Sequence, residues 1–362
     1  MAVTTGKAPD FRIRQQQPLN AGPRLSRLGE ALVTPVEHFF VRNHGDVPSP
    51  DPERHRLRVS GHVSRSLDLS LAELSRFPQR EVVATLQCAG NRREEMMALR
   101  PIPNELDWGS EAVGNARWAG VALADVLAAA MPAESAVHVE LIGLDEAERH
   151  GTRFAFGGSI PLAKALGSEV LLAVAMNGRP LEAVHGAPLR AVVPGYIGAR
   201  SVKWLSEIRL RATPSENYFQ ARAYRLFAPD VRAENVVWEE GIMLGELPVN
   251  SIITAPPSGA ELDSGRVRIE GLALVGGGRR IERVDVSANG GTEWRSAQLD
   301  AGAGPWAWRL WSCELDLPPG THEIVARAWD SAAQTQPEHV AQVWNFKGYM
   351  NTAWPRVTIR CR

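Results

Sequence analysis

Cys88 is the residue of this chain whose type and position most suggest chemistry. It follows the apolar run at 82–86, and two arginines, Arg92 and Arg93, come shortly after it. An apolar run that ends in small residues predicts a buried strand that opens into a loop. Nearby positive charge favours the thiolate, which is the form that binds soft metals or attacks electrophiles. The alternative is a buried and inert cysteine, since no second Cys or His stands at zinc-like spacing.

Three other segments are rich in groups that bind anions. They cover residues 39–44, 185–190 and 195–204. Each places Arg, Lys or His beside glycine or at the end of a predicted strand, where backbone N–H groups and fixed cations can surround a phosphate-like ligand. Together with Cys88, the three segments indicate a site for an anionic ligand.

In residue type and order, Cys88 and these segments resemble the sulfite oxidase family of molybdenum-cofactor enzymes. The resemblance extends from about Phe39 to the C-terminus. It implies a strand-rich α+β molybdenum-cofactor domain with the sulfite-oxidase fold, followed by an all-β immunoglobulin-like sandwich that serves as a dimerisation domain. It also implies a molybdenum–molybdopterin cofactor (a Mo-pyranopterin) with Cys88 as the protein ligand to the metal. No haem or flavin is expected in this chain.

The resemblance assigns further residues to the cofactor, whose phosphate needs paired cations and backbone donors. The implied cofactor-binding residues are Phe40, Val41, Arg42, Asn43, His44, Asp145, His185, Arg190, Ser201, Val202 and Lys203. Two of them have plainer readings, since Asp145 could merely begin a loop and His185 could be a satisfied turn histidine.

The resemblance also implies a substrate pocket that neutralises and orients a small oxyanion, a task suited to the arginine fork. Its expected residues are Arg42, Arg93, Trp108, Tyr224 and Lys347. Taken alone, Arg93 would be read as a surface ion-pair residue. Tyr218 is rejected as the active-site tyrosine, because Tyr224 has the spacing from Arg190 that the family shows.

Lys347 departs from the best-known members of the family, in which an arginine is expected. Lysine keeps the charge but loses bidentate recognition. The change from arginine to lysine therefore bears on the affinity for the substrate and on its identity, and not on the cofactor. The competing interpretation of Lys347 is a solvated lysine at a strand end.

The elements that must position these residues fall into two regions, separated by a break near 241–265. We expect an N-terminal extension at 1–38, a molybdopterin-binding catalytic domain at 39–240 and the immunoglobulin-like domain at 245–362. Upstream, Ser70 and Glu73 form a possible capping box, residues 121–130 are helical in composition, and a strand at 137–142 should end at Gly143. Downstream, short alternating strands with turn punctuation replace the helical signals.

Four tryptophans of the second region, Trp306, Trp308, Trp311 and Trp329, are expected to be core or interface aromatics. Trp306 and Trp308 should share one face of a strand, and Trp311 breaks that register, as a bulge would allow. Their exposed parts would suit a subunit contact.

Length and composition agree with two domains, because 362 residues exceed the size at which one core stops growing. A net charge of −1 argues against a general nucleic-acid or membrane surface role. The apolar stretch at 170–176 is too short to span a bilayer. A polar start without an export signal predicts a cytoplasmic location. Three cysteines with no paired spacing predict no disulfide framework.

The function that the resemblance implies is oxidation of sulfite to sulfate by oxygen-atom transfer. The electrons should pass to an external acceptor, such as oxygen or a cytochrome, and the chain should form a homodimer. One alternative is a nitrate reductase-like molybdenum enzyme. Another is a non-enzymatic cofactor-binding or adhesion-like protein, which would not need Cys88, Arg93 and Tyr224 together.

Overall fold

The strand predicted ahead of Cys88 is β5, Gln79–Gln87, in a computed structural model that describes residues 6–362. It belongs to a five-stranded antiparallel sheet in the order β10 (Arg179–Pro180), β9 (Leu171–Met176), β6 (Val113–Ala122) and β5, with β11 (Arg190–Val192) also pairing with β9. The last four residues of β5 are all buried. Cys88 therefore leaves the sheet inside the protein.

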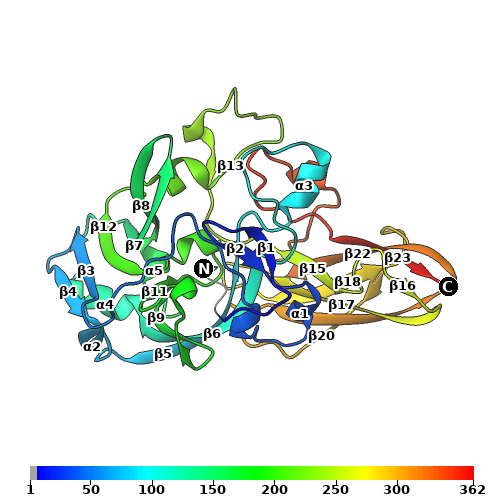
Figure 1. The fold of residues 1–362 in the computed structure, drawn as a ribbon, viewed down its shortest axis with the longest axis horizontal. Coiled ribbons are helices and arrows are strands. Elements are labelled where there is room, and N and C mark those ends of the chain that lie inside the picture. The colour runs from blue at the N-terminus through cyan, green and yellow to red at the C-terminus, as the bar shows by residue number, and fades with distance from the viewer. Residues whose placement is uncertain (1–5) are drawn as a thin grey trace.

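A second five-stranded sheet lies in the same N-terminal domain (Figure 1). Its order is β4 (Leu67–Ser70), β3 (Arg56–Gly61), β12 (Leu205–Arg211), β7 (His138–Arg149) and β8 (Thr152–Pro161). The prediction that the strand at 137–142 ends at Gly143 is wrong. The register between β7 and β8 shifts between Ile142 and Glu146, and this irregularity lets β7 continue and places Asp145 within it.

The helices of this domain are short. They are α1 (Ser26–Gly29), α2 (Leu71–Leu74), α3 (Arg93–Leu99), α4 (Leu123–Ala130) and α5 (Leu162–Ala165), together with the single turns η1 (Val36–His38), η2 (Ala183–His185), η3 (Gly198–Arg200), η4 (Phe219–Ala223) and η5 (Trp238–Glu240). The capping box of α2 is confirmed: the Glu73 N–H donates to Ser70 Oγ at 3.2 Å and the Ser70 N–H to the Glu73 carboxylate at 2.8 Å. The predicted helix at 121–130 loses its first two residues, because they end β6.

The C-terminal domain is a sandwich of two sheets, and it forms the elongated end of the molecule that carries the C-terminus (Figure 1). One sheet has the order β15 (Asn250–Ala255), β17 (Gly265–Leu274), β21 (Arg309–Leu317) and β20 (Gln298–Leu299); the other has the order β16 (Glu261–Leu262), β23 (Arg356–Cys361), β22 (Gly320–Asp330), β18 (Ile281–Ser287) and β19 (Arg295–Ser296). Ile269, Val284 and Ile324 belong to the apolar core of this domain. A short pair, β13 (Arg225–Leu226) and β14 (Ile242–Met243), precedes the sandwich. One short helix, α6 (Val340–Val343), was not expected.

The expectation that Trp306 and Trp308 share one strand is wrong, since both precede β21. The pairing of β17 with β21 also runs through Trp311 without a bulge. Instead, the segment before β21 binds the N-terminal domain. The Trp308 N–H donates to Thr85 Oγ1 at 2.8 Å, and the Thr85 N–H donates to the Trp306 carbonyl at 2.9 Å. These tryptophans join the two domains beside β5.

The first described residues pack on both domains. Strands β1 (Arg12–Gln15) and β2 (Asn20–Gly22) pair, Ala21 also bridges to Val41, and α1 contacts β15. Among the described residues, no helix has the length and apolar character needed to cross a membrane. Cys88, Cys313 and Cys361 are all buried free thiols.

Candidate functional site

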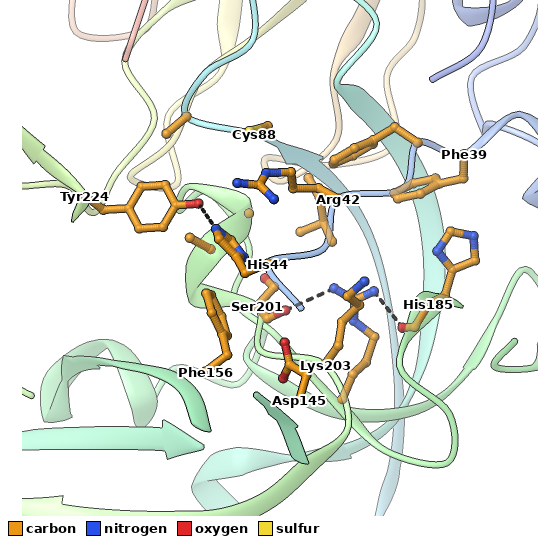
Figure 2. Close-up of a pocket in the computed structure, with 16 residues that line it drawn as sticks. Phe39, Arg42, His44, Cys88, Asp145, Phe156, His185, Ser201, Lys203 and Tyr224 are labelled. Carbon is orange, nitrogen blue, oxygen red and sulfur yellow. Dashed lines mark hydrogen bonds between the residues drawn. The ribbon is translucent and has the colours of Figure 1, made fainter. Parts of the chain in front are cut away.

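A cavity at the end of β5 collects most of the residues that the sequence assigned to a site (Figure 2). We call it the inner cavity. It is lined by Phe39, Phe40, Arg42, His44, Leu86, Cys88, Ala89, Asp145, Phe156, His185, Arg190, Gly198, Ala199, Ser201, Lys203 and Tyr224. The lining comes from loops and strand ends of both sheets of the N-terminal domain.

Cys88 lies at one end of this cavity and is only 6% exposed. Its backbone N–H donates to the Ala112 carbonyl at 2.9 Å, and its Sγ accepts from the Gly90 N–H at 3.4 Å. The thiol is therefore held in a fixed direction. Arg42 lines the same cavity; burial opposes its charge, but the neighbouring Tyr224 and Cys88 side chains outweigh burial and raise its pKa.

Two buried cations stand at another part of the inner cavity. Arg190 donates to the His185 carbonyl at 2.8 Å and to the Ser201 carbonyl at 3.1 Å, and Lys203 donates to the Val184 carbonyl at 2.9 Å. Burial lowers the pKa of Arg190 to about 9. Burial, with Arg190 close by, also lowers the pKa of Lys203 well below its ordinary value. Such a pair would be stabilised by an anion placed between the two cations.

Asp145 is the carboxylate of the inner cavity and is 4% exposed. Burial raises its pKa to about 6, although Lys203 acts in the opposite direction. Its Oδ1 is buried and has no hydrogen-bond partner among the described residues. A buried acceptor of this kind needs a donor, so Oδ1 marks a position for a ligand N–H or O–H group.

His44 and Tyr224 form a neutral, hydrogen-bonded pair in the lining of the inner cavity (Figure 2). His44 Nε2 lies 2.7 Å from the Tyr224 hydroxyl, and the imidazole stacks on Phe156 with ring centroids 4.6 Å apart. Burial, with Arg42 nearby, lowers the pKa of His44 well below its ordinary value. Burial raises the pKa of Tyr224 to about 12. At neutral pH the two uncharged rings therefore share one hydrogen bond.

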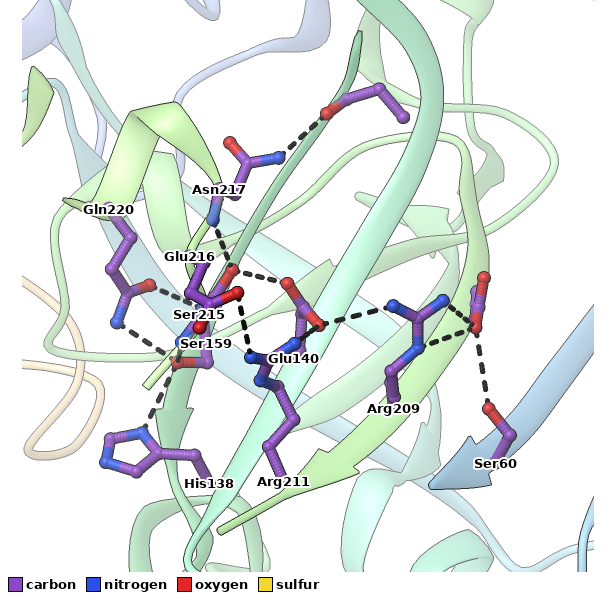
Figure 3. Close-up of polar contacts among 12 residues, drawn as sticks. Ser60, His138, Glu140, Ser159, Arg209, Arg211, Ser215, Glu216, Asn217 and Gln220 are labelled. Carbon is purple, nitrogen blue, oxygen red and sulfur yellow. Dashed lines mark hydrogen bonds and ion pairs between the residues drawn. The ribbon is translucent and has the colours of Figure 1, made fainter. Parts of the chain in front are cut away.

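A buried polar network fixes the segment that leads to Tyr224 (Figure 3). Ser159 Oγ accepts from the Ser215 N–H at 2.9 Å and from Gln220 Nε2 at 3.0 Å. The Ser215 hydroxyl donates to Glu140 of β7. Because Gln220 lies in η4 and Tyr224 directly follows that turn, the second sheet positions the tyrosine.

Arg42 and His44 also line a second cavity, which we call the outer cavity, and Asn43 lines the outer cavity alone. Its remaining lining residues are Gln15, Pro18, Asn104, Glu105, Leu106, Arg149, Tyr218, Phe219, Ala223, Lys347 and Tyr349. Both tyrosines considered from the sequence thus reach a cavity: Tyr224 lines the inner one and Tyr218 the outer one. Lys347 forms an ion pair with Glu105, and both side chains are mostly buried.

Arg93 and Trp108 do not line either cavity. Arg93 is 3% exposed and donates to the carbonyls of Gly348 at 3.1 Å and Leu106 at 2.9 Å. Trp108 is fully buried in the cluster that contains Cys88. Among the expected cofactor residues, Val41 and Val202 are buried core side chains, also outside both linings.

The sequence reading missed several lining residues and one neighbour. Phe156, Glu105, Arg149 and Tyr349 belong to this group. The neighbour is Lys7, whose Nζ lies 2.6 Å from His185 Nε2 and whose pKa burial lowers to about 8. These residues stand outside the recognisable segments, and no local pattern distinguishes them from ordinary core or surface positions.

Both domains of the chain match families of known proteins. Residues 44–219 match the oxidoreductase molybdopterin binding domain, and residues 242–362 match the Mo-co oxidoreductase dimerisation domain. The chain is 44% identical to the mitochondrial sulfite oxidase of Homo sapiens, over 97% of this chain and 66% of that protein. It is 39% identical to sulfite oxidase of Arabidopsis thaliana, over 97% of this chain and 94% of that protein.

A solved structure gives the same fold. The sulfane dehydrogenase SoxCD from Paracoccus pantotrophus matches with a TM-score of 0.82 and 26% identity, over 96% of this chain and 85% of that one. A strand-rich molybdopterin-binding domain followed by a dimerisation domain defines a molybdenum-cofactor oxidoreductase. Within that class, the chain belongs to the sulfite oxidase family. The predicted family, fold class and cofactor are confirmed.

The inner cavity fits the molybdenum–molybdopterin cofactor in three respects. Cys88 offers one fixed soft donor. Arg190 and Lys203 are buried cations suited to a phosphate. Asp145 Oδ1 is an acceptor that lacks a protein donor and suits a polar edge of a fused ring.

Proposed function

We propose that this protein oxidises sulfite to sulfate: sulfite and water give sulfate, two protons and two electrons, and the electrons pass to an external acceptor. The observation that carries the proposal is a set of cations that line two cavities with Arg42 in common. Arg149 and Lys347 line the outer cavity, Arg42 lines both cavities, and Cys88 lies in the inner one. Two relatives that support the proposal are named sulfite oxidase.

Within the proposal, Cys88 is the protein ligand to molybdenum. Arg190, Ser201 and Lys203 bind the phosphate of the cofactor, and Asp145 accepts a hydrogen bond from its ring system. When bound, the cofactor supplies the two-electron chemistry and the oxygen atom that is transferred. The bound phosphate also stabilises the charges of Arg190 and Lys203, which burial otherwise opposes.

Arg42 is the proposed orienting residue for the oxyanion. Its guanidinium is already fixed by bonds to the Asn43 carbonyl and, at 3.3 Å, to Asn20 Oδ1. A pre-positioned fork loses little freedom when it binds an oxyanion. The Tyr224 hydroxyl and His44 Nε2 lie beside it, so a proton released near Tyr224 can pass along their hydrogen bond.

Arg93 lies outside the lining of the outer cavity but contacts residues of that lining. Its guanidinium stacks on Tyr349, with the ring centroid 5.1 Å away, and binds the backbone of residues 347–348. In the proposal it orders the wall of the substrate pocket and adds positive potential.

The proposed assembly is a homodimer built through residues after about 245. Supporting it are the match of residues 242–362 to a dimerisation domain and the sheet edges of the sandwich, which a twofold interface would cover. Light scattering at micromolar concentration should give twice the chain mass, and a monomer would contradict this. The cytoplasmic location stays a prediction.

Steady-state turnover decides the activity. Molybdenum-loaded protein should reduce an artificial electron acceptor with sulfite as the donor. Nitrate is the necessary competitor, because the chain is also 36% identical to the nitrate reductase of Hordeum vulgare, over 97% of this chain and 42% of that protein. Nitrate reduction without sulfite oxidation would overturn the proposal.

A further inference from the structure

Glu105 is the one carboxylate among the described residues that line the outer cavity. Its Oε1 pairs with Lys347 Nζ, and its Oε2 lies 3.5 Å from Arg93 Nη2. The side chain is 17% exposed, so the pair is partly shielded from water. The carboxylate therefore stands between two cations that the proposed function assigns to the substrate pocket.

The pairing divides the cations of the outer cavity into two kinds. Lys347 already pairs with a carboxylate, Glu105, which it shares with Arg93. Within residues 6–362, the hydrogen bonds of Arg149 and Arg42 go to uncharged acceptors: Arg149 donates to the Glu148 carbonyl at 2.7 Å, and Arg42 donates to the Asn43 carbonyl and to Asn20 Oδ1. An oxyanion entering this space meets free charge at Arg42 and Arg149, but must compete with Glu105 for the ammonium of Lys347.

The position of the pair is built into the fold. Arg93 donates to the Leu106 carbonyl at 2.9 Å and to the Gly348 carbonyl at 3.1 Å. These carbonyls belong to the residues next to Glu105 and Lys347, which come from different domains. One buried guanidinium thus holds both partners' backbones, so the ion pair does not depend on the chance meeting of two flexible side chains.

We propose that Glu105 is a specificity-determining residue: it is an internal counter-anion that occupies Lys347 and weakens the binding of doubly charged oxyanions in the outer cavity. The inference rests on the proposed function and assigns a role to Glu105 within it. Its effect falls on the substrate and, more strongly, on the sulfate product, whose release it favours. The rival interpretation is a structural clamp between the domains, which would affect stability and leave anion binding unchanged.

The test uses Glu105→Gln in the molybdenum-loaded full chain, because glutamine keeps the shape and removes the charge. Titration calorimetry with sulfate at low ionic strength should show binding at least about threefold tighter than in the parent protein. The Michaelis constant for sulfite should fall by a similar factor while kcat changes less than about twofold. Raising the salt concentration should shrink both differences, since the effect is electrostatic.

Asp107→Asn is the matched control. Asp107 lies two residues further on, its side chain is 63% exposed, and it pairs with Arg14 at 3.5 Å outside the cavity lining. The Asp107→Asn variant should bind sulfate with the same affinity as the parent protein. The double variant Glu105→Gln/Lys347→Met should bind sulfate no more tightly than the parent protein, because the ammonium that Glu105→Gln makes available for sulfate is then absent.

Unchanged or weaker sulfate binding in Glu105→Gln would overturn the inference, and a lowered melting temperature alone would support the clamp. Sulfate titration needs no turnover. If the parent protein fails to oxidise sulfite, the proposed function is overturned, while the titration still decides whether Glu105 controls oxyanion binding.

Discussion

The inner and outer cavities share Arg42 and His44 but differ in whether their lysine is paired with a carboxylate. In the inner cavity, Arg190 and Lys203 are buried, and burial lowers the pKa of both. In the outer cavity, Lys347 is matched by Glu105. Uncompensated buried charge destabilises the protein until a ligand compensates it, whereas a matched pair is stable alone and can be opened. The first arrangement suits a resident cofactor and the second a substrate that comes and goes.

The strongest test of the inner cavity replaces its soft donor. Cys88→Ser should retain the pterin, because Arg190 and Lys203 are untouched, but should lower sulfite turnover by about a hundredfold or more, since a harder ligand alters the metal's redox behaviour. Molybdenum and pterin content measured beside kcat separate the two effects. Cys313→Ser, in the core of the other domain, is the control and should turn over normally. Full activity in Cys88→Ser would remove the ligand assignment.

Lys203→Met should separate cofactor binding from stability. It removes a cation whose charge burial opposes, so the cofactor-free protein should melt at a higher temperature. The same change should weaken cofactor retention by about thirtyfold, the lower end of what loss of one partner from a buried charge pair costs.

Cofactor content after dialysis and melting curves of the cofactor-free protein measure both quantities. Lys164→Met is the matched control. Lys164 lies outside the lining of the inner cavity and forms an ion pair with Glu169 at 2.6 Å. Loss of this ion pair should lower the melting temperature and leave cofactor retention unchanged. Retention by Lys203→Met equal to that of the parent would mean that the phosphate lies elsewhere.

The two cavities also differ in how far the sequence predicted them. Most residues of the inner cavity lie in short segments, such as 39–44 and 201–203, whose local composition already indicates anion binding. The outer cavity also contains Glu105 and Arg149, which lie outside those segments and which only the tertiary fold brings to Lys347. In a sequence, a lone glutamate or arginine resembles any solvated surface residue.

The sequence also failed to predict those parts of the fold that depend on tertiary contacts. Local patterns predicted the strand before Cys88, which is β5, and an all-β region of short alternating strands, which is the sandwich. They missed the continuation of β7 through Asp145, which depends on an irregular register with β8. They also misplaced Trp308, whose partner Thr85 lies in the other domain.

Asp145 should make cofactor binding in the inner cavity depend on pH. Its pKa in the free protein is about 6, raised by burial, and a donor from the bound cofactor should lower it. The contribution of Asp145 to cofactor affinity is then fully present above about pH 6. It is lost as pH falls through that value, by up to about tenfold in affinity per pH unit. For the free protein the sign reverses: the contribution of Asp145 to stability is present below its ordinary pKa and is lost as pH rises through about 6.

Retention assays between pH 5 and 7 should show this dependence, and Asp145→Asn should remove the fall near pH 6. The lowered pKa values of Lys7 and Lys203 act in the opposite direction, since loss of these cations weakens anion binding as pH rises. His44 and His185 should not contribute, since burial lowers the pKa of each well below its ordinary value and keeps both neutral over most of this range. A profile that stays steep in Asp145→Asn would assign the titration to another group.

Lys347 tests whether the outer cavity depends on the C-terminal domain. Lys347→Met removes the ammonium and leaves Glu105 paired with Arg93 alone, so the outer cavity loses one positive charge. The Michaelis constant for sulfite should rise about tenfold, equivalent to about 1.4 kcal/mol, with little change in kcat. Lys347→Arg should be tolerated or bind sulfite more tightly, because a guanidinium can bind Glu105 and an oxyanion at the same time. Unchanged constants for Lys347→Met would show that Arg42 and Arg149, both from the N-terminal domain, attract the substrate without help from the second domain.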